Sequence, residues 1–333
     1  MPAVLYQDSR RSYHTLSLIF HRAEWRCCPG SYQASFIERG HIVQLIIEAI
    51  ITGVLTGGIY ALMSSGLTLL FGVMEIINVG QGALVILGAY LSYALEQNLH
   101  IDLFLGLLIT MPVMFLLGVG MELLFIRPVK GDRTMLSILV TYGIALIIEG
   151  ILNLIFTANN VQLQAWYITA SFDIGGFYLA YIYVFSFLLA VVLLTGLYLL
   201  LYRTKLGYSL RATMQNRMAA ELIGIDVKRI STITFGIGIA LAAAGGMGFG
   251  ATNAFDAGSA YDLISRLLAI IIFGGMGSLS GALIASIGML VIEDVTSVVW
   301  SPIWASTVFF ILLVIILVVR PQGLLGQVEG RKQ

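Results

Sequence analysis

The chain has 333 residues, of which 59% are hydrophobic and only 11% are Asp, Glu, Lys or Arg. A water-soluble domain is about one quarter charged, so this composition excludes a chain that covers its own surface in water and predicts one that faces lipid. The 18 basic and 18 acidic residues cancel, which removes the electrostatic reason to expect nucleic acid as a partner.

The first 41 residues differ from the rest because they are polar and mixed in charge. Their apolar run, residues 16–20, is too short for the core of a signal peptide. We expect residues 1–41 to be a cytoplasmic N-terminal extension, and two interpretations stay open: a disordered segment, or a start codon assigned too early. The two cysteines, Cys27 and Cys28, are adjacent and have no metal-site spacing, so we expect no metal and no other cofactor.

Apolar segments long enough to cross a bilayer, which takes about 20 residues, follow in chain order. Six are uninterrupted: 42–64, 101–126, 134–157, 177–202, 230–252 and 303–319. Two longer regions, 66–96 and 262–298, are interrupted by polar and glycine residues at 75–82 and 274–281. Because helices satisfy their own backbone hydrogen bonds in lipid, the sequence predicts an all-α, polytopic bundle of about 8 to 10 membrane segments, two of them broken or re-entrant.

The loops give the orientation, because Lys and Arg concentrate in loops that stay in the cytoplasm. Lys and Arg are found in residues 127–133, in residues 203–229 and in the segment from Arg320 onward. The connections near 97–102, 157–176, 252–262 and 293–302 contain no Lys or Arg and are expected outside. The N-terminal stretch also carries arginines, at positions 10, 11, 22, 26 and 39. Both termini, including the tail 327–333, are therefore expected in the cytoplasm, and each interrupted region is expected to begin and end outside.

The two interruptions are the predicted lining of a translocation path, since broken helices at membrane depth occur where protein or a water-filled cavity shields them. Residues 71–74 (Phe-Gly-Val-Met) are echoed by 273–276 (Phe-Gly-Gly-Met), and 82–84 (Gly-Ala-Leu) by 281–283, which indicates a weak internal repeat. The predicted path residues are Glu75, Asn78, Gln81, Gly82, Gly274, Gly275, Gly277, Ser278, Ser280 and Gly281. Glycines four apart, at 53/57, 246/250 and 277/281, predict close helix packing.

Residues 66–90 resemble the signature of the branched-chain amino acid permeases of ATP-binding-cassette transporters, a pattern that is roughly GLxLxFGVxxxINxAHGxxxMLGAY. Three later stretches agree: 211–225 with RAxAxNxEAAxLxGI, 274–282 with GGxGSxxGA, and 320–326 with RPxGLxG. The resemblance defines a transmembrane permease domain over residues 42–326. Met218 replaces the usual Glu of the loop. Gly80 and Gln81 replace the usual Ala-His in the presumed path, so urea, amides or other amino acids stay open as substrates.

The resemblance implies a transport subunit in the cytoplasmic membrane and no enzymatic activity in this chain. The sequence has no GxxxxGK[ST] phosphate loop, so ATP hydrolysis is expected on a separate subunit. The implied partners are ATP-binding-cassette ATPase subunits, a second permease subunit, an extracytoplasmic solute-binding protein and membrane lipid.

An ion-coupled secondary transporter is the alternative, with Glu149 or Glu75 as the coupled carboxylate. The long basic loop 203–229 weighs against it. Glu293 lies near a predicted span end, from which its side chain is expected to reach the lipid headgroups, whereas Glu149 and Arg266 are harder to place in a membrane.

The loop 203–229 contains a predicted short helix that Asn216 can cap and Gly224 can end. Met214, Met218 and Leu222 recur every four residues and therefore share one face. In the family that the chain resembles, such a loop seats in a groove of the ATPase; a helix lying flat on the lipid surface is the alternative. The predicted coupling residues are Asn216, Met218, Ala219, Ala220, Glu221, Leu222 and Gly224.

Overall fold

The computed structural model describes residues 31–129, 133–157, 159–174 and 177–326. Most of the predicted N-terminal extension and the whole tail 327–333 lie outside these ranges. From Gln44 onward the chain forms one compact unit, and the residues before it form a separate unit. The description below concerns the compact unit.

Helices dominate the described residues. The long ones are α2 (Ser31–Met74), α3 (Gln81–Leu99), α4 (Leu103–Met121) with its π-helical extension η1 (Glu122–Ile126), α5 (Arg133–Phe156), α7 (Tyr181–Arg203), α10 (Val227–Thr252), α11 (Ser259–Gly274), α12 (Leu279–Val299) and α13 (Pro302–Val319). Seven of the described helices, all but α3 and α11 of this set, are long and apolar enough to cross a membrane. The predicted polytopic helical bundle is confirmed.

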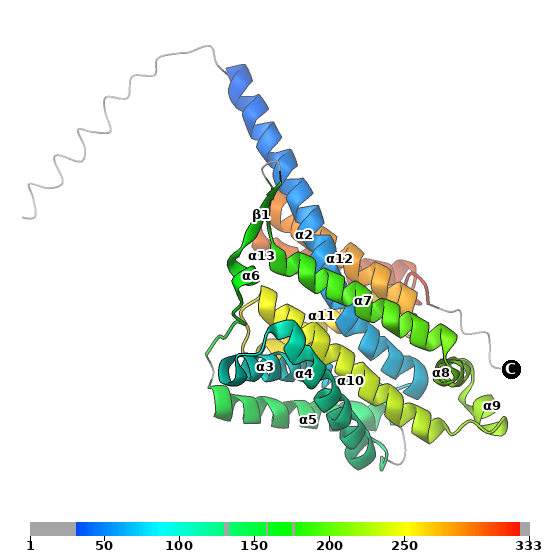
Figure 1. Cartoon of the computed structure of the whole chain (residues 1–333). Coiled ribbons are helices and arrows are strands. Elements are labelled where there is room, and N and C mark those ends of the chain that lie inside the picture. The colour runs from blue at the N-terminus through cyan, green and yellow to red at the C-terminus, as the bar shows by residue number, and fades with distance from the viewer. Residues whose placement is uncertain (1–30, 130–132, 158, 175–176, 327–333) are drawn as a thin grey trace, which may run out of the picture. The chain divides into compact units, whose positions relative to one another are not determined.

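Short elements lie in the connections. They are α6 (Trp166–Thr169), β1 (Ser171–Ile174), β2 (Phe177–Ala180), α8 (Lys205–Gln215) and α9 (Arg217–Leu222). Strands β1 and β2 pair antiparallel, with Ser171 opposite Ala180 and Ile174 opposite Phe177. The all-α prediction missed this hairpin, because β2 is apolar and merges in hydropathy with α7. Figure 1 shows α6 and β1 at one end of α7, and α8 and α9 at the other.

Helix α10 forms the centre of the bundle and packs chiefly against α3 and α4. Most of its membrane span, 83%, is buried inside the protein. Its glycines allow this contact: a Cβ at Gly246 would collide with the Val85 carbonyl oxygen of α3. The predicted role of Gly246 in close helix packing is thereby supported, since only a residue without a side chain leaves room for the neighbouring backbone.

Helix α2 continues without a break through Gly66 to Met74. The predicted span 42–64 and the first part of region 66–96 are therefore one helix. A Cβ at Gly66 would collide with the Gly238 carbonyl oxygen of α10, so this glycine serves helix contact and does not mark a turn.

The part of α2 that belongs to the compact unit runs from one end of the bundle, near Gln44, to the other, near Met74. Just after Met74, the Glu75 carbonyl accepts a hydrogen bond from Thr134 Oγ1, at the start of α5 and beside the basic connection 127–133. Near the start of the compact unit, Leu45 and Glu48 line a pocket with Asp294, close to the lysine- and arginine-free α12–α13 connection. Residue 66 lies within this helix and not at a membrane face. The expectation that residues 66–96 begin and end at the same side is therefore wrong.

Candidate functional site

The first interruption, residues 75–80 between α2 and α3, is tied into the protein interior. Asn78 and Gln81 are fully buried. The Asn78 Nδ2 group donates to Gln81 Oε1 at 3.1 Å, and Gln81 Nε2 donates to the Gly238 carbonyl of α10 at 3.4 Å. The backbone N–H of Val79 donates to Thr141 Oγ1 of α5 at 3.2 Å. These amides therefore join the interruption to two neighbouring helices.

We expect Gln81→Leu to lower the melting temperature of the detergent-solubilised protein. The substitution leaves the Asn78 amide and the Gly238 carbonyl without their partner, and an unsatisfied buried group costs about 1–3 kcal/mol. Ser280→Ala is the control, because Ser280 is an exposed path residue with one long hydroxyl contact. An unchanged melting temperature with reduced uptake would instead assign Gln81 to the substrate path.

The second interruption joins α11 to α12 through glycines with positive φ. Gly275 has φ +103° and Gly277 has φ +81°, values that residues with a side chain rarely adopt. Ser278 caps α12, since its Oγ accepts from the Gly281 N–H at 3.2 Å. A Cβ at Gly281 would collide with the Gly274 carbonyl oxygen, so the two helix ends meet backbone to backbone.

The C-terminal segment 320–326 completes this interruption. The Leu324 N–H donates to the Phe273 carbonyl at 2.9 Å, and the Leu325 N–H donates to the Gly274 carbonyl at 3.0 Å. These are carbonyls at the end of α11, which a helix leaves without intrahelical partners. The sequence motif at 320–326 carried no such prediction, because the partners lie about 50 positions earlier in the chain.

A cavity of about 400 Å³ opens beside the second interruption, between α2, α7, α8 and the start of α12. Of the predicted path residues, Gly277, Ser278 and Ser280 line it. The buried amides of Asn78 and Gln81 belong to a different place in the bundle. The structure therefore does not bring the two interruptions together around this one cavity.

The predicted coupling helix is present as α9. Asn216 caps it, with Oδ1 accepting from the Ala219 N–H at 3.0 Å, and Gly224 follows with φ +89°. Met218, Leu222 and Ile223 are 75%, 84% and 75% exposed. An apolar face is thus presented outward, whereas Ala220 is buried against the protein.

Met214 does not belong to this face. The extended backbone at Asn216, with φ −157°, separates α8 from α9, so the four-residue spacing does not continue across it. Met214 instead packs towards α2, where a Cβ at Gly72 would collide with its methyl group. The prediction of a shared Met214/Met218/Leu222 face is wrong for Met214, and its place is taken by Ile223.

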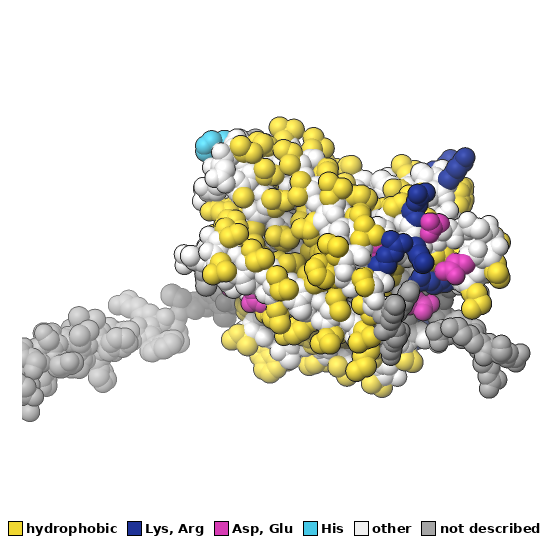
Figure 2. Space-filling model, turned by 90° about the horizontal axis from the view of Figure 1, so that it is seen from below, with side chains coloured by type: hydrophobic (Ala, Val, Ile, Leu, Met, Phe, Trp, Pro, Cys, Tyr) yellow, Lys and Arg dark blue, Asp and Glu magenta, His cyan; other side chains and the backbone are white. Residues whose placement is uncertain are grey.

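Helix α9 also adjoins the first interruption. A pocket of about 240 Å³ is lined by Ile76 of that interruption and by Arg127, Arg217 and Lys228. In Figure 2 basic side chains gather at one end of the face shown, while hydrophobic side chains cover most of the rest. Helix α9 therefore lies at the basic end of the bundle.

We expect Gly224→Val to leave membrane insertion intact and to reduce uptake strongly. A Cβ at Gly224 has open space around it, so the substitution acts through backbone strain at positive φ, about 1–2 kcal/mol or more for a branched side chain. Gly196→Ala, which also has open space but sits inside α7, is the control. Normal ATP-dependent uptake by the Gly224→Val variant would contradict the role of this turn.

Residues 49–317 match the family model of the branched-chain amino acid transport system / permease component. The chain belongs to this family. It is 24% identical over 309 residues to the high-affinity branched-chain amino acid transport system permease protein BraD of Pseudomonas aeruginosa, covering 86% of the chain and 97% of BraD. It is 28% identical over 298 residues to the probable branched-chain amino acid transport permease protein LivH of Methanocaldococcus jannaschii, covering 85% and 92%. No solved structure matches the chain.

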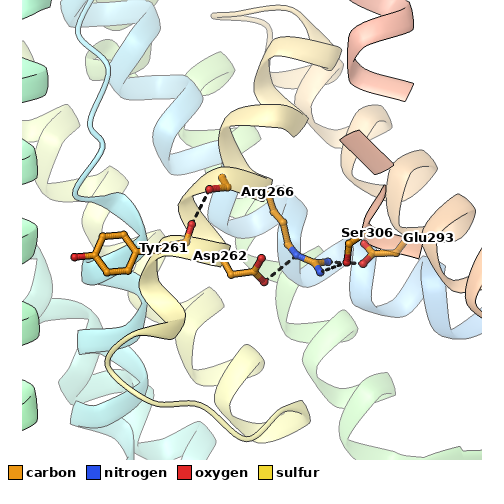
Figure 3. A network of polar contacts seen from close by, with 6 residues as sticks. Tyr261, Asp262, Arg266, Glu293 and Ser306 are labelled. Atoms are coloured by element: carbon orange, nitrogen blue, oxygen red, sulfur yellow. Dashed lines mark hydrogen bonds and ion pairs between the residues drawn. The ribbon is translucent and has the colours of Figure 1, made fainter. Parts of the chain in front are cut away.

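A buried ion pair links three helices of the permease (Figure 3). Arg266 of α11 donates to Glu293 Oε1 of α12 at 2.6 Å and to Ser306 Oγ of α13 at 3.3 Å. The side chains of Arg266 and Glu293 are only 16% and 10% exposed, whereas that of Asp262, 3.1 Å from Arg266 Nε, is 68% exposed. Glu293 does not reach the headgroups as predicted, because it is paired inside the bundle.

The carboxylates that an ion-coupled permease would need are placed differently. Glu149 accepts a hydrogen bond from Tyr261 at 2.5 Å, and Glu75 is exposed at the end of α2. Within the described ranges, no group of three or more His, Cys, Asp or Glu side chains could hold a metal ion. Neither observation favours an ion-coupled mechanism.

Proposed function

We propose that this permease carries branched-chain amino acids, or closely related small amino acids, through the membrane as part of an ATP-driven importer. The observation that carries the proposal is helix α9: it is capped, exposed and apolar, and it stands beside the first interruption of the bundle. The names of the relatives, which specify branched-chain amino acid transport, support the substrate class.

The proposed partners are two ATPase subunits, a second permease and an extracytoplasmic solute-binding protein. An exposed apolar face on a solvated helix indicates a protein partner, and no phosphate loop is present in this sequence. A second permease is supported because the chain is similar to two Escherichia coli proteins, LivH at 26% identity and LivM at 24%.

We propose that the basic end of the bundle, with α8, α9 and the C-terminal segment, faces the cytoplasm. The start of the compact unit at Gln44 then faces outside. The N-terminal extension, residues 1–41, was expected in the cytoplasm because it carries Arg10, Arg11, Arg22, Arg26 and Arg39. With α2 as a single crossing, that expectation and the orientation of the compact unit oppose each other, and labelling near Gln44 decides between them.

Cysteine labelling in intact cells tests this orientation. In a Cys27→Ser/Cys28→Ser background, we expect Leu45→Cys and Trp300→Cys to react with a membrane-impermeant maleimide, and Met218→Cys to react only after permeabilisation. All three side chains are exposed, by 44%, 68% and 75%. Reaction of Trp300→Cys without reaction of Leu45→Cys would contradict the single crossing of α2.

The mechanism follows from the contacts of α8 and α9. ATP-driven closure of the ATPases displaces α9, and the joint at Asn216 passes this displacement to α8. Met214 of α8 packs against Gly72 at the end of α2. Gly277 of the second interruption is close to the same glycine, because a Cβ placed on Gly277 would lie 3.8 Å from the Gly72 Cα. Motion of α8 therefore acts on both interrupted regions.

Reconstitution tests the proposed function. The permease, its ATPases and its binding protein in proteoliposomes are expected to accumulate labelled leucine, isoleucine or valine when ATP is present, and not when a proton or sodium gradient replaces ATP. Gradient-driven uptake by the permease without ATPase would favour the ion-coupled alternative.

A further inference from the structure

The cavity beside the second interruption holds a cation without a counter-ion. Arg211 of α8 reaches it, and among the described residues that line it none is Asp or Glu. Within the described ranges Arg211 takes part in none of the ion pairs, and its Nε is buried without a hydrogen-bond partner. A buried donor of this kind is costly unless an acceptor binds to it.

Two tyrosines orient this guanidinium. Its central carbon lies 4.4 Å from the ring centroid of Tyr202 and 5.1 Å from that of Tyr208. Stacking against aromatic faces holds the planar group while leaving its N–H edge available, and that edge matches a carboxylate. The start of the 21-residue helix α12, capped by Ser278, borders the same cavity and adds a partial positive charge.

The rest of the cavity has two kinds of wall. Leu194, Leu197 and Leu201 of α7, with Leu283 of α12, form an aliphatic side, whereas Ser65, Gln215 and Ser280 offer hydroxyl and amide oxygens. A volume of about 400 Å³ falls in the range of small-molecule sites. One guanidinium, a few polar oxygens and an aliphatic wall together match the carboxylate, the ammonium and the side chain of an aliphatic amino acid.

We propose that this cavity is a binding site for the transported amino acid within the permease, with Arg211 holding its α-carboxylate. The proposal rests on the proposed function, because it takes the substrate class from there. The site lies at the basic end of the bundle and is built partly by α8, so displacement of α9 changes its walls. It is therefore the last site that the substrate occupies before release into the cytoplasm.

The test measures direct binding of labelled leucine to the permease–ATPase complex in phosphatidylcholine nanodiscs, without binding protein. Wild type is expected to bind leucine, and unlabelled leucine but not leucinamide, which lacks the carboxylate, is expected to compete. Arg211→Gln is expected to weaken binding about tenfold or more, since it removes a charge-assisted hydrogen bond, and Arg211→Lys is expected to weaken it less. Arg203→Gln, which removes an exposed cation at the end of α7, is the matched control.

A second variant covers the case in which Arg211→Gln fails to fold. Leu283→Trp narrows the aliphatic side and keeps Arg211, and it is expected to weaken leucine binding more than alanine binding. Equal binding by wild type and Arg211→Gln, or competition by leucinamide as strong as by leucine, would overturn the proposal. So would a bound anionic lipid, seen by native mass spectrometry when phosphatidylglycerol is included, that is lost in Arg211→Gln while leucine binding is absent.

Uptake separates the two proposals. A complex that imports leucine with ATP but shows no Arg211-dependent binding refutes the site and leaves the proposed function in place. A complex that imports none of leucine, isoleucine and valine refutes the proposed function itself.

Discussion

A permease that carries Met218→Asp together with Leu222→Asp is expected to lose its ATPase and its uptake. The two side chains are 75% and 84% exposed on α9, and two carboxylates there cannot enter an apolar groove without an unpaired desolvated charge. The helix itself should persist, because the Asn216 cap and the Gly224 turn are unchanged. We expect co-purification of the ATPase to fall by at least about tenfold, since two buried apolar side chains contribute about 1.5–3 kcal/mol each.

The matched control for this experiment exchanges the same two side chains conservatively. Met218→Leu with Leu222→Met keeps the apolar surface and the size of the face, so ATPase binding and leucine uptake should stay close to wild type. If the double aspartate variant still holds the ATPase and transports normally, α9 does not dock on it, and a helix resting on the lipid surface becomes the better interpretation.

Arg266→Met is expected to destabilise the permease more than any other single substitution considered above. It leaves the Glu293 carboxylate 10% exposed and without its cation, and breaking a buried pair from one side costs about 3–5 kcal/mol. Arg266→Met combined with Glu293→Met removes both charges and replaces them with apolar side chains, so we expect much of the stability to return. The melting temperature of the purified protein measures both effects.

Asp262→Asn supplies the internal comparison, because Asp262 also contacts Arg266 but its side chain is 68% exposed. An ion pair with so exposed a partner contributes at most about 1 kcal/mol to the free energy of unfolding. The melting temperature should therefore change little. Two results would show that this network does not hold α11, α12 and α13 together. One is an Arg266→Met variant as stable as wild type. The other is a double variant whose loss of stability exceeds the sum of the losses in Arg266→Met and Glu293→Met.

The parts of the site that the sequence predicted well are local. Helix α9 needs only a cap, a left-handed turn and apolar spacing, and all three lie within the ten residues 216–225. Met218 and Leu222, predicted to share this face, are both exposed in the structure. The inclusion of Met214 failed because the extended backbone at Asn216 separates α8 from α9.

The parts that sequence reasoning missed depend on distant partners. From the sequence, a span 42–64 is expected to be separate from a region 66–96. Inside α2, however, the Ser65 hydroxyl donates to the Leu62 carbonyl at 2.7 Å, and Gly66 makes room for α10. Hydropathy does not distinguish such a helix from two shorter ones. The pairing of Arg266 with Glu293 and the cavity at Arg211 likewise require knowledge of which helices are neighbours.

The contact between residues 324–325 and the end of α11 bears on how the protein is made. Residues 324–325 leave the ribosome after α11 and α12, because both helices precede them in the chain. Until then the carbonyls of Phe273 and Gly274 lack the backbone partners that they have in the finished chain. The second interruption therefore cannot reach its final form before the chain has been synthesised beyond residue 325.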